Sequence, residues 1–326
     1  MNQDKVIVIT GPTGVGKTKL SIEVAKKING EIINADSTQV YKGLDIATAK
    51  VKEKEKEGIQ HHLFDIKDIN ENYTVYDYQK DCRSKIDEIL SRGNVPILVG
   101  GTGLYIKAAL YDYKFDNENI ANTYEEYSTE DLYNMLKKID NNTDIHPNNR
   151  KRIIRALNYY NNTNKPLSEK EKNDKLLYPT IFIGLTTDRV TLYDRINKRV
   201  DKMIDEGLLI EAKKIYDSNV KTKAVLTPIG YKELFEYFDG NKSLEECIEL
   251  IKQRSRRYAK RQYTWFNNQM NINWFNVNFN NFDNTINEVI KFIDKYWFAY
   301  LFLYNLCIRE GGVYKLWWRT IIRYYW

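Results

Sequence analysis

Short apolar runs alternate with segments of helical periodicity along most of the chain. Residues 6–9, 32–33, 96–99 and 180–185 are apolar, as expected for buried strands. After the first run, apolar residues recur every three or four positions, and the same spacing returns over 76–90, 104–110 and 188–207. Strands that alternate with helices predict an α/β fold with a parallel sheet.

This alternation stops between residues 113 and 177. The segment 116–142 is polar and acidic, and we expect one helix over 130–139 and a second after Asn148 or Asn149. We interpret 113–177 as a helical insertion in the core. The expected organisation is a first core part at 1–112, the insertion at 113–177, core completion with C-terminal helices at 178–296, and an aromatic tail at 297–326.

The segment 246–266 is the clearest amphipathic helix. At 100° per residue, Tyr258 and Trp265 fall with aliphatic residues on one face, and no acidic residue occurs between 252 and 262. The charge density suits a phosphate backbone, and a helix lying on a membrane surface is the alternative. Six cations occupy the opposite face: Lys252, Arg254, Arg256, Arg257, Lys260 and Arg261.

A phosphate-binding loop lies between the first strand and the first helix. Its glycines let backbone N–H groups turn toward an anion, and the helix N-terminus adds partial positive charge. Lys17 supplies a full charge, and the Thr18 hydroxyl can hold a magnesium ion. The loop consists of Gly11, Pro12, Thr13, Gly14, Val15, Gly16, Lys17 and Thr18.

Polar residues follow two other strands, where parallel sheets bind ligands. Asp36 follows 32–33 and is expected near the phosphate loop; capping of a following helix is the alternative. Thr102 follows 96–99, where an ATPase would carry an acid for magnesium, and it can also cap the next helix. Residues 38–50 are polar and aromatic, which suggests a substrate loop.

Three other features leave alternatives open. Arg195 and Arg199 lie one helical turn apart and either reach the phosphate crevice together or remain exposed. His61 and His62 are adjacent, which favours a structural role over a metal site. The run 297–308 is apolar but too short to span a bilayer; the tail either packs on the core as a helix, anchors at a membrane interface, or lies outside the fold, and no membrane partner is expected.

The composition of the chain bears on its partners and on its cellular compartment. The chain has 326 residues and a net charge of +6, which is compatible with a nucleic-acid partner without requiring one. The three cysteines are odd in number and widely spaced, as in a reduced cytosol. A strand begins almost at the N-terminus without a signal-peptide pattern, so we expect a cytoplasmic protein.

Taken together, the motifs resemble one family, the tRNA dimethylallyltransferases or isopentenyl-tRNA transferases. They run in the family's order over residues 1 to about 296. The resembling blocks are GPTGVGKT at 11–18, NADSTQVYKGLDIATAK at 34–50, HHLFDI at 61–66, VGGTGLY at 99–105, IHPNNRKRIIRAL at 145–157, DRVTLYDRINKRVDKMIDEGL at 188–208, IGYKE at 229–233 and RRYAKRQYTWF at 256–266.

The resemblance implies a P-loop NTPase-like core that binds the pyrophosphate of dimethylallyl diphosphate. It implies that Asp36 takes the proton from the amine of an adenine beside the anticodon and that Thr102 contacts this base. Arg199 is expected to neutralise the leaving pyrophosphate with Lys17, Thr18 and Mg²⁺. The protein is expected to be a monomer. Expected tRNA contacts are Asp36, Ser37, Thr38, Gln39, Thr102, Asn149, Arg150, Lys151, Arg152, Ile153, Arg257 and Arg261.

The sequence departs from the family at two places in the insertion. The stretch between Asn122 and Leu132 is short, with Thr123 and Tyr124 near the usual position of an RNA-contacting arginine, and Asn164 replaces a usual glycine. The sequence leaves two alternative functions. A small-molecule kinase also needs Asp36 as base but does not need the basic helix. A non-catalytic RNA-binding NTPase needs an acid after Val99, which is absent.

Overall fold

The computed structural model describes residues 5–115, 124–170 and 175–309, with 297–309 described by their backbone alone. The chain forms two compact units. The first combines Met1–Leu110 with Tyr178–Trp326, and the second is Tyr111–Leu177.

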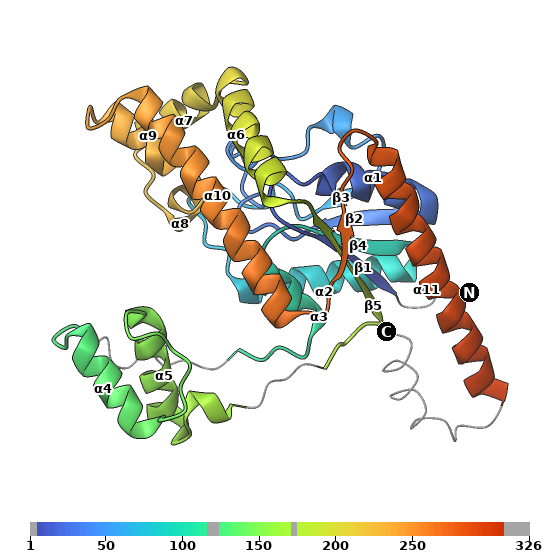
Figure 1. Ribbon diagram of the computed structural model, residues 1–326, viewed down its shortest axis with the longest axis horizontal. Helices are drawn as coiled ribbons and strands as arrows, with labels where there is room; N and C mark the ends of the chain where they lie inside the picture. Colours follow the sequence, from blue (N-terminus) through green and yellow to red (C-terminus); the bar gives the residue numbers. More distant parts are fainter. Residues whose placement is uncertain (1–4, 116–123, 171–174, 310–326) are drawn as a thin grey trace. The chain divides into compact units, whose positions relative to one another are not determined.

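The first unit is built on a six-stranded sheet with the order β3-β2-β4-β1-β5-β6 (Figure 1). All five neighbouring strand pairs are parallel, which confirms the predicted α/β class. The two outer strands β3 and β6 are short and were not predicted. The strands are β1 (Val6–Thr10), β2 (Gly30–Asn34), β3 (His61–His62), β4 (Val95–Val99), β5 (Thr180–Thr186) and β6 (Asn273–Asn276).

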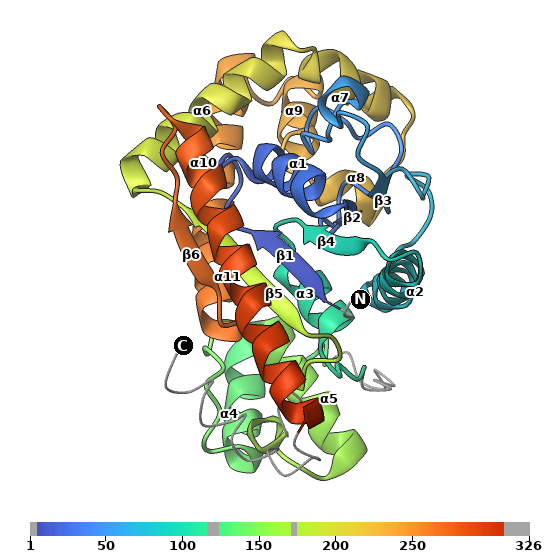
Figure 2. The same ribbon diagram turned by 90° about the vertical axis from the view of Figure 1, so that its right-hand side faces the viewer.

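Helices cover both faces of this sheet. On one face, Ile7 and Ile9 of β1 share a buried cluster with residues of α1 (Lys17–Ile28) and α11 (Phe282–Arg309). The alternate residues Val6 and Val8 are also fully buried, as a strand covered on both sides requires. α2 (Val75–Ser91) and α3 (Gly103–Leu110) pack together on the other face, as the turned view shows (Figure 2).

The remaining helices of the first unit follow β5. The amphipathic segment forms α10 (Leu244–Gln269), which starts at a capping box between Ser243 and Glu246. α10 packs against α6 and α9. The sequence pattern does not predict α11 as a whole; it marks only the aromatic run at its end. The other helices after β5 are α6 (Arg189–Asp205), α7 (Leu208–Asp217), α8 (Lys223–Leu226) and α9 (Tyr231–Phe238); the 3-10 turn η1 (Glu53–Glu55) lies earlier, between β2 and β3.

The 297–308 run belongs to a longer helix. Its backbone forms the last part of α11. Within the described residues, no helix combines the length and the apolar character that crossing a membrane requires. The rest of the predicted tail, 310–326, lies outside the described residues.

The second unit is a small helical pair. α4 (Thr129–Ile139) and α5 (Arg150–Thr163) bury Leu132 and Leu136 against Ile153 and other apolar residues, and η2 (Leu167–Glu169) follows. Asn164 ends α5 with a left-handed φ of 53°. Glycine adopts this conformation easily and asparagine tolerates it, which explains the departure at 164. Asn122 and Thr123 lie outside the described residues.

Candidate active site

The phosphate-binding loop lies between β1 and α1 at the carboxyl end of the sheet. Gly11, Gly14 and Gly16 all have positive φ, at 137°, 82° and 100°. A Cβ on Gly11 would lie 2.5 Å from the carbonyl oxygen of Leu185, and one on Gly16 would lie 2.7 Å from the Phe282 ring. Both space and backbone conformation therefore require glycine at these two positions.

Lys17 lies folded over this loop. Its ammonium donates hydrogen bonds to the carbonyl oxygens of Gly11 and Pro12, each at 2.9 Å. Burial, together with the charge of Arg199, lowers the pKa of Lys17 to about 7, and Asp36 opposes the shift. The structure thus brings Lys17, Arg199 and Asp36 within electrostatic range of one another.

Arg199 and Arg195 take different positions on α6. Arg195 Nε donates to the carbonyl oxygen of Gly14 at 3.1 Å, and its guanidinium lies 3.8 Å from the centroid of the Phe279 ring. Burial lowers the pKa of Arg199, Asp36 raises it, and Arg195 lowers it again. Arg195 thus contacts the phosphate loop directly, whereas Arg199 interacts electrostatically with both Asp36 and Lys17.

Asp36 follows β2 in a turn of irregular backbone rather than before a helix, so the helix-cap alternative is wrong. Its Oδ1 accepts hydrogen bonds from the amide and the hydroxyl of Thr38, at 3.0 and 2.7 Å. These bonds fix the carboxyl group of Asp36. Thr38, which was predicted to contact RNA, therefore also holds Asp36 in place.

Thr102 joins the loop after β4 to the loop after β2. Its hydroxyl accepts from the amide of Ser37 at 3.1 Å, and its own amide donates to the carbonyl oxygen of Ala35 at 3.1 Å. A Cβ on Gly100 would lie 2.2 Å from that same carbonyl, so the two loops are in direct contact. Ser37 and Thr102, both predicted to contact RNA, are therefore neighbours of Asp36.

Tyr258 of α10 is a site residue that the sequence did not reveal. Burial and the Asp36 carboxylate raise the pKa of its phenol, and a hydrogen bond with Thr102 opposes the shift. The helical projection placed Tyr258 on the apolar face, and only the spatial contact of α10 with the strand-end loops distinguishes it from a core residue.

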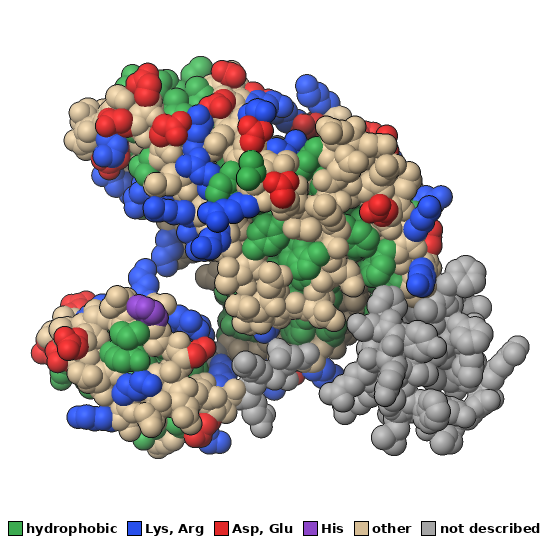
Figure 3. Space-filling model, in the orientation of Figure 1, with side chains coloured by type: hydrophobic (Ala, Val, Ile, Leu, Met, Phe, Trp, Pro, Cys, Tyr) green, Lys and Arg blue, Asp and Glu red, His purple; other side chains and the backbone are tan. Residues whose placement is uncertain are grey.

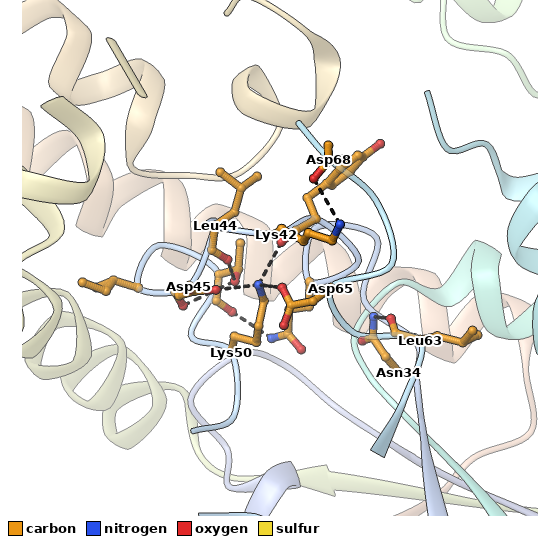
Figure 4. Close-up of polar contacts among 12 residues, drawn as sticks. Asn34, Lys42, Leu44, Asp45, Lys50, Leu63, Asp65 and Asp68 are labelled. Atoms are coloured by element: carbon orange, nitrogen blue, oxygen red, sulfur yellow. Dashed lines mark hydrogen bonds and ion pairs between the residues drawn. The ribbon is translucent and has the colours of Figure 1, made fainter. Parts of the chain in front are cut away.

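The predicted substrate loop, 38–50, is fixed from within by Lys50 (Figure 4). The Lys50 side chain is 6 % exposed and donates to Tyr41 O at 2.8 Å and to the carboxylates of Asp45 and Asp65, each at 2.5 Å. Gln39 Nε2 donates to the carbonyl oxygen of Thr48 at 2.8 Å. The predicted RNA contact Gln39 thus also holds this loop.

Glu211 of α7 fixes the same loop from outside. Its carboxylate accepts from three consecutive backbone amides, those of Asp45, Ile46 and Ala47, at 2.9–3.2 Å. It also accepts from the hydroxyl of Tyr231 at 2.6 Å. Burial and the Glu211 carboxylate raise the pKa of Tyr231, so this phenol remains a donor.

Comparisons with known proteins decide the family. The profile described as IPP transferase matches residues 39–269. The chain belongs to the IPP transferase family. A curated relative from Anoxybacillus flavithermus, named tRNA dimethylallyltransferase, is 50 % identical over 300 residues, which cover 89 % of this chain and 96 % of that protein. The relative of the same name from Bacillus subtilis is 48 % identical over 85 % of this chain and 93 % of its own length.

Solved structures are similar to this IPP transferase in both sequence and fold. The full-length tRNA isopentenylpyrophosphate transferase from Bacillus halodurans is 44 % identical with a TM-score of 0.70, over 90 % of this chain and 96 % of that chain. A eukaryotic dimethylallyltransferase described as acting on tRNA is 36 % identical with a TM-score of 0.72, over 83 % of this chain and 73 % of that chain.

The basic face of α10 in this IPP transferase is smaller than the sequence predicts. Lys252 pairs with Asp201 at 2.8 Å, Arg254 pairs with buried Glu233, and Arg256 donates to Asn197 Oδ1 at 2.5 Å. The expectation of six cations available to a phosphate backbone is therefore corrected for these three, because acidic and amide groups of neighbouring helices engage them. The exposed cations are Arg257, Lys260 and Arg261, and Figure 3 shows Lys and Arg side chains gathered over α10.

The predicted RNA contacts of the second unit divide into two kinds. Lys151 and Arg152 are exposed on α5, and Asn149 caps this helix by accepting from the Arg152 amide at 3.3 Å. Arg150 instead donates to the carbonyl oxygens of Tyr127 and Tyr124, at 2.7 and 2.6 Å. Ile153, also predicted to contact tRNA, is fully buried, so its side chain is not accessible to RNA.

The adjacent histidines have structural partners. His61 Nδ1 bonds to the carbonyl oxygen of Ile59 at 2.8 Å, and His62 Nε2 bonds to buried Glu31 at 2.6 Å. Across the part of the chain that the structure describes, no three His, Cys, Asp or Glu side chains are grouped to hold a metal ion. Thr18, exposed in the first turn of α1, supplies a hydroxyl beside the phosphate loop.

Proposed function

We propose that this protein transfers the dimethylallyl group from dimethylallyl diphosphate to the N6 amine of the adenine 3′-adjacent to the anticodon in tRNA. The products are N6-(dimethylallyl)adenosine and pyrophosphate. The observation that carries the proposal is the convergence of Lys17, Arg199 and Asp36, which interact electrostatically at the carboxyl end of the sheet. The printed names of curated relatives at about 50 % identity support it.

The carboxylate of Asp36 serves as general base. The adenine amine is a weak nucleophile, because its lone pair is delocalised into the ring. Asp36 accepts the N6 proton as the N–C bond to the dimethylallyl carbon forms and the C–O bond to the diphosphate breaks. The bonds from Thr38 hold Asp36 Oδ1 in place, so Oδ2 is the oxygen that takes the proton.

Lys17 and Arg199 stabilise the charge that develops on the leaving group. The bridging oxygen of the diphosphate gains negative charge as the C–O bond breaks, and fixed cations at that place lower the barrier. Burial is the main cause of the lowered pKa of both groups; repulsion from Arg199 adds to it at Lys17, and repulsion from Arg195 adds to it at Arg199. An anion beside these two cations compensates for their burial and favours the diphosphate over a neutral ligand.

A magnesium ion fits this site. Mg²⁺ prefers oxygen ligands and is commonly held by one protein oxygen, phosphate oxygens and water. The Thr18 hydroxyl would be its ligand from the protein, and when bound the ion would neutralise diphosphate charge. The place of this threonine at the end of the phosphate-binding motif supports the assignment.

The tRNA is proposed to bind through exposed cations. Arg257, Lys260 and Arg261 on α10, with Lys151 and Arg152 on α5, would contact phosphates of the anticodon stem-loop. The target adenine must leave its stack to reach Asp36 and Thr102, and loop bases do so at low cost. We further propose that the protein acts as a monomer in the cytoplasm.

One incubation tests this function. The purified protein is mixed with tRNA lacking the modification, dimethylallyl diphosphate and Mg²⁺, and the nucleosides are analysed by mass spectrometry. We expect dimethylallyl-adenosine from wild type and a single-turnover rate about 10²- to 10⁴-fold lower from Asp36→Asn. A wild type that leaves tRNA unchanged but phosphorylates a small alcohol with ATP would identify a kinase instead.

A further inference from the structure

Gln262 is a buried polar residue on the helix that carries the proposed RNA-binding cations. Its side chain is 5 % exposed, whereas the preceding Arg261 and Lys260 are exposed. Gln262 Oε1 accepts from the amide of Thr13 at 3.1 Å, and Nε2 donates to the carbonyl oxygen of Gly101 at 3.1 Å. One carboxamide therefore connects α10 to both the phosphate loop and the loop after β4.

The glycines after β4 leave room for this contact with α10. A Cβ on Gly101 would lie 2.0 Å from Gln262 Nε2, and a Cβ on Gly103 would lie 2.0 Å from the Trp265 ring. Neither glycine has the positive φ of an anion-binding loop. The glycine-rich segment 100–103 thus lets α10 approach the loop after β4 closely. The hydrogen bond from Gln262 then fixes the direction of the Gly101 carbonyl.

The Thr13 amide is engaged by this bond. Although Thr13 lies in the phosphate-binding motif, its N–H points to Gln262, so it does not serve as a donor to the diphosphate. The bond instead fixes the peptide plane between Pro12 and Thr13, whose carbonyl partner accepts from Lys17 at 2.9 Å. The position of Lys17 thus depends on a residue of α10.

On the other side, Gly101 precedes Thr102, whose hydroxyl accepts from Ser37 beside Asp36. We propose that Gln262 is a positioning residue that holds the diphosphate loop and the Asp36–Thr102 region in the relative placement that transfer requires. This inference rests on the proposed function. It predicts that loss of the carboxamide slows the chemical step more than it weakens tRNA binding, because Arg257 and Arg261 remain.

Two substitutions of Gln262 test the role, and a substitution of Gln253 on the same helix is the matched control. Gln262→Met keeps the size and removes both hydrogen bonds, and Gln253→Met makes the same change at an exposed position of α10. We expect Gln262→Met to lower the single-turnover rate by about 10- to 100-fold, with tRNA affinity within about twofold of Gln253→Met. Equal rates in the two folded variants would overturn the proposal.

Gln262→Glu adds a pH signature. A neutral carboxylic acid offers one O–H donor and one acceptor, as the amide does, whereas the carboxylate offers only acceptors and repels the Gly101 carbonyl. Burial raises the pKa of such an acid, so the change occurs at accessible pH. We expect its rate relative to wild type to fall as pH rises, and a constant ratio contradicts the assigned bonds.

Binding of Mg²⁺-pyrophosphate separates this inference from the proposed function. Release of the Thr13 peptide should weaken pyrophosphate binding by Gln262→Met about 2- to 10-fold, the worth of one hydrogen bond. This titration needs no tRNA. If wild type fails to modify tRNA while this difference appears, the function is wrong and the positioning role stands; unchanged pyrophosphate affinity counts against the role itself.

Discussion

The side-chain amide of Asn34 holds the backbone of Asp36 from both sides. Asp36 N donates to Asn34 Oδ1 at 2.9 Å, and Asn34 Nδ2 donates to the carbonyl oxygen of Asp36 at 3.0 Å and to that of Leu63 at 3.0 Å. Asn34 is the last residue of β2 and is completely buried. The proposed base is therefore attached to the rigid sheet through a residue that does not reach the substrate.

Asn34→Asp tests this attachment with little change in shape. The carboxylate still accepts from Asp36 N but cannot donate to the two carbonyl oxygens. A small displacement of a catalytic group can lower the rate about 100-fold, and we expect a loss of about 10- to 100-fold in single turnover. Pyrophosphate affinity should stay within about twofold of wild type.

A matched control keeps this prediction specific. Asn94→Asp makes the same change near the start of β4, where Asn94 donates to Glu31, away from Asp36. Thermal unfolding of both variants checks that they are folded. If Asn34→Asp and Asn94→Asp transferred the prenyl group equally fast, the Asn34 bonds would be irrelevant to the base.

Lys17 should make diphosphate binding depend on pH. Its pKa is about 7 in the free protein, chiefly because it is buried. Above pH 7 the ammonium loses its proton, and an anion then binds only as the proton returns, so affinity falls by up to about tenfold per pH unit. Below pH 7 the lysine is already charged and contributes no such dependence.

Calorimetric titration of Mg²⁺-pyrophosphate in buffers of different ionisation enthalpy measures this proton uptake. At pH 8.5 we expect wild type to take up one proton more than Lys17→Met. Lys19→Met, which removes an exposed lysine two positions along α1, should behave as wild type. Equal proton uptake by the two methionine variants would mean that Lys17 keeps its charge throughout.

The sequence predicts the four inner strands and the ligand-binding residues at their ends, because both depend on residues that are neighbours in the chain. A strand followed by glycines and Lys17 requires a helix start, and parallel strands place Asp36 and Thr102 at the same edge. Tyr258 and Gln262 were missed for a physical reason. On a helical projection a buried tyrosine or glutamine resembles a core residue, and its polar partners at Thr102 and Gly101 are about 160 residues away.

The same limit explains the errors on the basic helices. A charge count on α10 does not reveal that Glu233 lies against Arg254, because α9 reaches it only through tertiary packing. For α5, the family pattern marks Ile153 without saying whether its side chain or its backbone matters, and burial excludes the side chain. Sequence identifies a charged helix; neighbouring helices decide which charges remain available.

Arg150 should stabilise the second unit rather than bind RNA. Its two bonds fix the backbone of Tyr124 and Tyr127, which precede α4. We expect Arg150→Ala to lower the free energy of unfolding of this unit by about 1 kcal/mol, as for a partly exposed charged donor. Hydrogen exchange of residues 124–163 measures the change, with Lys151→Ala as control.

The exposed cations of α10 should contribute to tRNA binding through phosphate contacts. Arg257 and Arg261 are one helical turn apart, and both are exposed. Each phosphate contact contributes about 0.7–0.9 to the slope of log affinity against log salt. Replacing both arginines by alanine should therefore reduce that slope by about 1.5 units and weaken binding broadly across tRNA species.

The double variant Lys27→Ala with Lys291→Ala controls for the loss of net charge. These lysines are exposed on α1 and α11 of the same unit, and their loss changes the net charge equally. Because electrostatic attraction at long range depends on net charge, both double variants should associate more slowly at low salt. Only the α10 variant should lose slope in equilibrium titrations between about 50 and 200 mM salt, and equal slopes in the two variants would assign the RNA-binding surface elsewhere.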